Sequence, residues 1–167
     1  MKLKTLPKDF SVLTKQCVAV TSKVSEKIIS EMKEILKLND GVGLAAPQVG
    51  LDMRLILCKD DPDSKKIHIL LNPLIVEKEG LNIDVEGCLS IPDLAVDVPR
   101  QTKIKVTYLD MDMNKKNIIV EGYFARVLQH EIDHLDGKLI IERGLDGSFF
   151  YRGEPFSKEE VLRKFLK

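Results

Sequence analysis

The stretch His130-Glu131-Ile132-Asp133-His134 places two histidines four positions apart, with a glutamate between them. Residues four apart lie on one face of an α-helix, so both imidazoles can reach one metal ion. Glu131 falls beside that face, where a general base can act on a metal-bound water. The alternative is a helix whose histidines merely share a face. The chain has only three histidines and two of them bracket this glutamate, which favours a metal helix.

Around this stretch the residue pattern predicts a helix over residues 122–136, ended by Gly137. Tyr123 and Val127 lie on the histidine face and could wall a slot for an apolar side chain beside the ion. The alternative for Val127 is a place in the core, as for most apolar helix positions. The polar residues Arg126, Gln129 and Asp133 are expected on the far side of the helix.

Two histidines do not complete a site, because catalytic zinc-type centres usually have three protein ligands and one open position. Cys88 is the best third ligand, since the preceding Gly87 lets the backbone come close. The alternative is that Cys88 is a small buried apolar residue, which is the expected role of Cys58. A purely structural metal domain would need a fourth protein ligand.

The rest of the chain predicts a single α+β domain over residues 1–167. A helix is expected from Ser25 to the Asn39-Asp40-Gly41 stop, and a short C-terminal helix after the capping box at Ser157. Strands are expected at Arg54–Cys58 and His68–Val76, and a hairpin is expected from Thr102–Leu109 and Asn117–Val120.

The charge composition bears on which binding partners the protein favours. Lys+Arg and Asp+Glu number 26 each in 167 residues, so no global field favours nucleic acid or an anionic membrane. The start of the chain lacks a secretory signal, and no segment is long and apolar enough to span a bilayer. The three cysteines form no disulfide pattern and are expected to be reduced, which indicates a cytoplasmic protein.

The segment Gly41–Gln48 contains the letters of a dinucleotide-binding fingerprint, G-x-G-x-x-A. That fingerprint needs a strand before it and a helix after it. Here a helix is expected before it, and Pro47 would fall inside the following helix, so a nucleotide site is rejected. The segment is expected to be irregular because it is rich in small residues.

Three motifs together resemble the peptide deformylase family: G-x-G-x-A-A-x-Q at Gly41–Gln48, E-G-C-L-S at Glu86–Ser90 and Q-H-E-x-D-H at Gln129–His134. Shorter matches accompany them at Gly50, Arg54, Asn72-Pro73, Pro99-Arg100 and Leu135-x-Gly137. The resemblance covers residues 40–143. It implies a small α+β fold with antiparallel strands packed around a central metal-binding helix.

The resemblance also implies an activity, the removal of formate from N-formylmethionine at the start of nascent polypeptides. Cys88, His130 and His134 would hold one divalent ion, with Fe²⁺ expected as the native metal and Zn²⁺ or Ni²⁺ as alternatives. Glu131 would be the acid/base catalyst. The implied oxyanion donors are the Gln48 amide and the Leu89 N–H, and the implied substrate contacts come from Val42, Gly43, Gly87 and Arg100.

The sequence leaves two alternatives, one for the class of enzyme and one for the role of the C-terminal segment. A zinc peptidase shares the helix motif, but its third ligand normally lies downstream, and no histidine follows His134. The segment 144–167, with Phe149-Phe150-Tyr151, matches no family motif. It is expected to pack on the domain, and the alternative is a docking surface for the ribosome or a second subunit.

Overall fold

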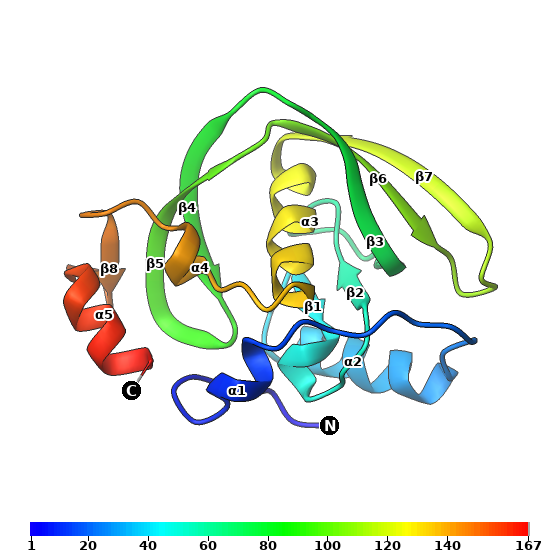
Figure 1. Cartoon of the computed structure of the whole chain (residues 1–167), viewed down its shortest axis with the longest axis horizontal. Helices are drawn as coiled ribbons and strands as arrows, with labels where there is room; N and C mark the ends of the chain where they lie inside the picture. Colours follow the sequence, from blue (N-terminus) through cyan, green and yellow to red (C-terminus); the bar gives the residue numbers. More distant parts are fainter. Residues whose placement is uncertain (167) are drawn as a thin grey trace.

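The computed structural model describes residues 1–166 of the chain. Its longest helix, α3 (Gly122–Leu135), lies between two antiparallel sheets, as Figure 1 shows. The first sheet has the order β1-β2-β3-β6-β7, with β1 at Gly43–Ala45, β2 at Leu55–Cys58, β3 at His68–Glu79, β6 at Lys103–Leu109 and β7 at Lys115–Glu121. The second has the order β4-β5-β8-β9, with β4 at Asn82–Cys88, β5 at Ile91–Arg100, β8 at Phe149–Tyr151 and β9 at Glu154–Pro155.

Helix α3 is buried on most of its circumference because sheets flank it. Its apolar side chains join a core cluster with Ile104 and Val106, which alternate along β6 as the sequence predicts. The helix ends before Gly137, whose φ of 69° is a left-handed conformation suited to glycine. A side chain there would also collide with the Thr14 carbonyl. The helix predicted over residues 122–136 is therefore confirmed, with its end fixed by Gly137.

The glycine-rich segment differs from the expectation of irregular structure. Residues Gly43–Ala45 form β1, which pairs with β2, and Ala46–Val49 form a 3₁₀ turn. The segment is wholly buried from Gly43 to Val49, and small residues are what this close packing admits. The strand pairing that fixes it is a long-range effect that composition does not reveal.

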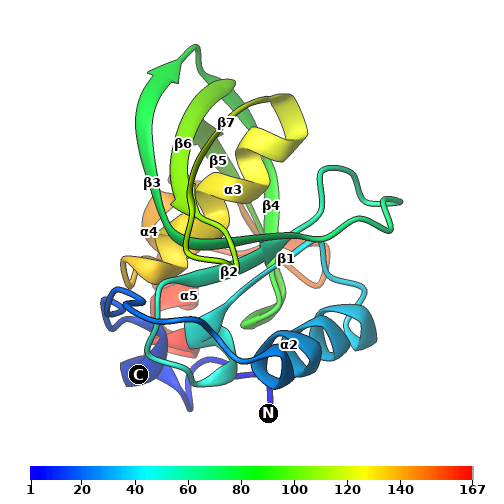
Figure 2. The same ribbon diagram turned by 90° about the vertical axis from the view of Figure 1, so that its right-hand side faces the viewer.

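The N-terminal helices lie below the sheets, as seen in Figures 1 and 2. A short α1 (Phe10–Leu13) precedes α2 (Glu26–Leu38), which begins at the predicted cap, Ser25, and buries Met32 and Leu36. The expected helix is thus confirmed. None of the helices in residues 1–166 has the length and apolar character needed to cross a bilayer.

The C-terminal segment packs on the domain. After α4 (Ile140–Arg143), strand β8 pairs with β5, and α5 (Lys158–Phe165) follows the predicted capping box. Phe149 and Phe165 are buried in the cluster that contains Val96 of β5. The predicted α+β architecture, with antiparallel sheets and a short C-terminal helix, is therefore confirmed.

Candidate metal centre

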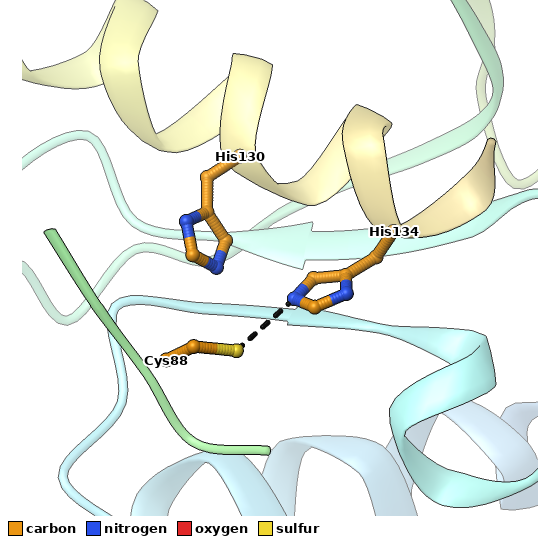
Figure 3. A group of neighbouring side chains, drawn as sticks. All are labelled: Cys88, His130 and His134. Carbon is orange, nitrogen blue, oxygen red and sulfur yellow. Dashed lines mark hydrogen bonds between the residues drawn. The ribbon is translucent and has the colours of Figure 1, made fainter. Parts of the chain in front are cut away.

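Cys88, His130 and His134 converge on one point. Cys88 is the last residue of β4, and both histidines project from α3 toward it, as Figure 3 shows. One potential ligand atom from each lies within 4.8 Å of the others, and the Cys88 Sγ is 3.2 Å from the His134 Nε2. Cys17 and Cys58 are free and buried elsewhere. Among residues 1–166 no other histidine, cysteine or carboxylate joins this cluster.

The donor chemistry fits a divalent transition metal, since one thiolate and two imidazoles are ligands that such ions prefer. Burial alone would raise the pKa of Cys88, but the nearby His134 and His130 outweigh it, and the pKa lies well below its usual range. The thiolate that a metal requires is therefore favoured. Within the described residues the buried Glu131 Oε2 has no hydrogen-bond partner, which leaves it free for a water molecule or substrate beside the cluster.

His130 is oriented by a carboxylate that the sequence reasoning did not single out. The Glu86 Oε2 lies 3.0 Å from the His130 Nδ1, so the Nε2 faces the cluster. Glu86 in turn accepts hydrogen bonds from Arg100 and Arg126. Burial raises the pKa of Glu86, but Arg100 and His130 outweigh it and hold the pKa well below its usual range. Glu86 is therefore a carboxylate that fixes the ring of a metal ligand.

Two predicted positions are corrected by this network. Arg100 does not line the cavity at the metal cluster; its buried guanidinium pairs with Glu86 and Asp133, so it is not placed to touch substrate. Arg126 does not lie on the far side of α3 either, because it reaches Glu86 beside His130. It precedes His130 by four residues, a spacing that could have indicated this.

Glu131 lies at the cluster and is almost completely buried. Burial raises the pKa of its carboxyl to about 7. Gly43 makes this position possible, because a Cβ at residue 43 would collide with the Glu131 carboxylate. The first glycine-rich motif and the helix motif thus meet in space. A carboxyl whose pKa lies near neutrality is suited to both taking and returning a proton.

The Gln48 amide has a defined orientation. Its Oε1 accepts the Ala45 N–H at 2.8 Å, so its amino group turns the other way, donating to the Ser90 Oγ at 3.2 Å and toward the Cys88 Sγ at 3.7 Å. The side chain is 1% exposed. A rigid N–H donor therefore lies next to the metal cluster.

The cluster opens into a cavity of about 600 Å³. It is lined by the predicted oxyanion donor Leu89 and by five of the predicted substrate-contact residues, Val42, Gly43, Gly87, Tyr123 and Val127. Val127 is buried, whereas Tyr123 is 43% exposed at the rim. The Val42 carbonyl already accepts the Lys59 N–H at 2.8 Å. Because hydrogen-bonding direction alternates along a strand, Gly43 presents its backbone groups to the opposite edge.

Comparison with known proteins agrees with this geometry. The family model described as polypeptide deformylase matches residues 1–147. A peptide deformylase of Symbiobacterium thermophilum is 45% identical over 135 residues, which are 79% of this chain and 62% of that protein. One of Dictyoglomus thermophilum is 43% identical over 129 residues, 74% of this chain and 81% of that protein.

The fold is also similar to solved structures of peptide deformylases. A peptide deformylase of Plasmodium falciparum superimposes with a TM-score of 0.84 at 28% identity, over 97% of this chain and 91% of that chain. A peptide deformylase of Thermotoga maritima superimposes with a TM-score of 0.80 at 37% identity, over 86% of this chain and 97% of that chain. The chain therefore belongs to the polypeptide deformylase family, metal-dependent hydrolases that remove the formyl group from nascent polypeptides.

Proposed function

We propose that this deformylase holds its metal on Cys88, His130 and His134 and uses Glu131 as its acid/base catalyst. The observation that carries the proposal is the convergence of the three ligands beside an unpartnered, buried Glu131 oxygen. A divalent ion held there would supply Lewis acidity and lower the pKa of a water at its open position. Among residues 1–166 no fourth ligand closes the cluster, which argues against a purely structural metal.

The protein groups have separate tasks in the reaction. Glu131 accepts the proton of the attacking water and later returns it to the amine that leaves. The Gln48 amide and the Leu89 N–H donate to the formyl oxygen as negative charge develops on it. Gln48 suits this task because its Oε1 is already occupied by Ala45, which aims the amino group at the reacting centre.

The substrate is an N-formylmethionyl peptide that enters as an extended strand. Gly43 and Gly87 lie on the cavity wall without side chains, so a peptide backbone can approach them closely. Val127 and Tyr123 wall the slot for the methionine side chain, next to His130. Val42 contributes its side chain to the wall, since its carbonyl is bonded to Lys59.

We further propose Fe²⁺ as the native metal, because a thiolate with two imidazoles accepts Fe²⁺ as well as Zn²⁺ or Ni²⁺. The place of action is the cytoplasm, where nascent chains emerge and thiols stay reduced. A ribosome contact through the C-terminal segment is compatible with the exposed side chains of Phe150 and Leu162 on its surface.

An assay with paired peptides tests the proposed reaction. A formyl-Met peptide and the same peptide without the formyl group are incubated anaerobically with enzyme of known metal content. We expect formate from the first peptide and no cleavage of either peptide chain. Internal cleavage of the unformylated peptide would identify a peptidase instead.

A further inference from the structure

A second cavity, of about 770 Å³, borders the C-terminal half of α3. None of the three metal ligands lines it. Several of the shorter family matches gather here instead, namely Arg54, Asn72-Pro73 and Pro99-Arg100. The charged side chains that line it are Arg54, Lys78, Arg100, Lys138 and Arg143 on the positive side, and Asp133 and Asp136 on the negative side.

A charge network connects the wall of this cavity, through Arg100, to Glu86 beside the metal cluster. Asp133 accepts hydrogen bonds from both Arg100 and Arg143, and Glu86 accepts them from Arg100 and Arg126. Three arginines therefore share two carboxylates. Five positive side chains line the cavity against two carboxylates, so its local field favours an anion.

Arg143 brings the excess charge to the cavity. Its Nε and Nη2 bind Asp133, while its Nη1 makes no hydrogen bond within residues 1–166, and its side chain is 40% exposed. Lys138 is exposed on the same wall and forms no ion pair with any residue from 1 to 166. The carboxylate of Asp136 is already paired with Arg54 at 2.7 Å and so does not oppose an incoming anion.

We infer that this cavity binds an oxyanion of the phosphate type between Arg143 and Lys138. The guanidinium offers a planar N–H donor and the ammonium a mobile one, a combination suited to an oxyanion with several acceptor oxygens. The bound anion offsets the excess positive charge of the cavity wall. The inference does not depend on the catalytic roles proposed above.

A titration of the full-length, zinc-loaded enzyme with inorganic phosphate tests the inference. Amide and arginine side-chain NMR signals are followed at constant ionic strength, with sodium chloride as the reference salt. We expect saturable shifts at residues 138–144 that chloride does not produce. Arg143→Gln should weaken phosphate binding by roughly 10-fold, the scale of one charge-assisted interaction.

Two further variants separate binding from structural damage. Lys138→Gln, which breaks no hydrogen bond of the fold, should also weaken binding, whereas Arg163→Gln on α5 should leave it unchanged. Shifts equal to those in chloride would overturn the inference, as would phosphate affinity unaltered in both cavity variants. Saturable shifts confined to residues around Cys88 would overturn it too, because they would place phosphate at the metal instead.

Discussion

The carboxylate of Glu131 is almost fully buried, yet one of its oxygens has no hydrogen-bond partner within residues 1–166. Leaving a buried polar atom unpaired costs roughly 1–3 kcal/mol, so such an atom indicates a role with water or substrate. Gln48 shows the opposite arrangement, because its oxygen is bonded and only its donor side faces the cluster. This difference matches the roles proposed for the two side chains, Glu131 as acid/base and Gln48 as oxyanion donor.

Glu131→Gln tests the acid/base role. The amide keeps the size of the side chain but cannot take a proton, so kcat should fall by roughly 10²–10⁴-fold. Metal content, measured by elemental analysis, should stay at the wild-type level. Glu159→Gln, on the exposed face of α5, serves as the control. Loss of metal from the Glu131 variant would show that this residue is a ligand.

Gln48→Leu tests the oxyanion donor. We expect kcat to fall by roughly 10²–10³-fold, as for other single oxyanion-hole donors. The free energy of unfolding should also fall by roughly 1–3 kcal/mol, because the buried Ala45 N–H loses its acceptor. Denaturant unfolding and steady-state kinetics measure the two effects separately. An unchanged kcat with reduced stability would assign Gln48 to packing alone.

At the scale of elements, the metal centre is the contact between one strand end and one helix. Strand β4 brings Cys88 and Glu86, and α3 brings His130, His134 and Glu131. Alternation along β4 puts Glu86 and Cys88 on the same face, so ligand and orienting carboxylate arrive together. Strand β1 completes the arrangement, since Gly43 leaves room for Glu131.

Val127→Phe tests whether α3 also walls the methionine slot. The larger ring should crowd the cavity, raising KM for formyl-Met peptides while metal content stays the same. Peptides with a smaller formylated first residue should be affected less. The check is a kcat and KM comparison across first residues. A uniform loss for every first residue, or none, would place the slot elsewhere.

The sequence predicted α2 and β6 because each has one buried face that marks the sequence with a period, and it predicted α3 from its histidine spacing and the stop at Gly137. It did not predict β4, whose side chains from Asn82 to Val85 are all exposed, nor β5, which is interrupted by prolines. These two strands pair with each other as a hairpin, and β5 is further fixed by its pairing with the distant β8. The three ligands and Glu131 were named from spacing and family resemblance, and the structure places all four together.

The buried network behind the ligands was not predictable in the same way. Polar residues on α3 were expected to face away, as they would on a helix with one solvated side. Helix α3 has sheets around it, so Arg126 and Asp133 are buried and need charged partners. Arg100 was assigned to substrate from the family resemblance, and its buried partners Glu86 and Asp133 come from segments distant in sequence.

At the scale of the whole molecule, the C-terminal segment is part of the second core. The family model ends at residue 147, but β8 continues the sheet of β4 and β5, and α5 covers that core. The strand that carries Cys88 is thus supported by a segment outside the family model. This sheet therefore links the packing of the C-terminal segment to the strand that carries Cys88.

Phe149→Ala tests that support. The side chain is 1% exposed, and its removal should lower the free energy of unfolding by roughly 3–5 kcal/mol. Thermal unfolding should show a Tm lower by roughly 6–20 °C for a domain of this size. The neighbouring Phe150→Ala is the matched control, since that ring is 37% exposed on the other face. Equal effects of both variants would contradict the packing described for β8.

The central claim is that one metal on Cys88, His130 and His134 is required for deformylation. The direct test is formate release from a formyl-Met peptide, measured anaerobically before chelation, after chelation and after adding back Fe²⁺, with metal content quantified at each step. We predict one metal ion per chain, loss of formate release with loss of the metal, and recovery on reloading. His130→Ala and His134→Ala should neither retain the metal nor recover. Full formate release from metal-free enzyme would contradict the account.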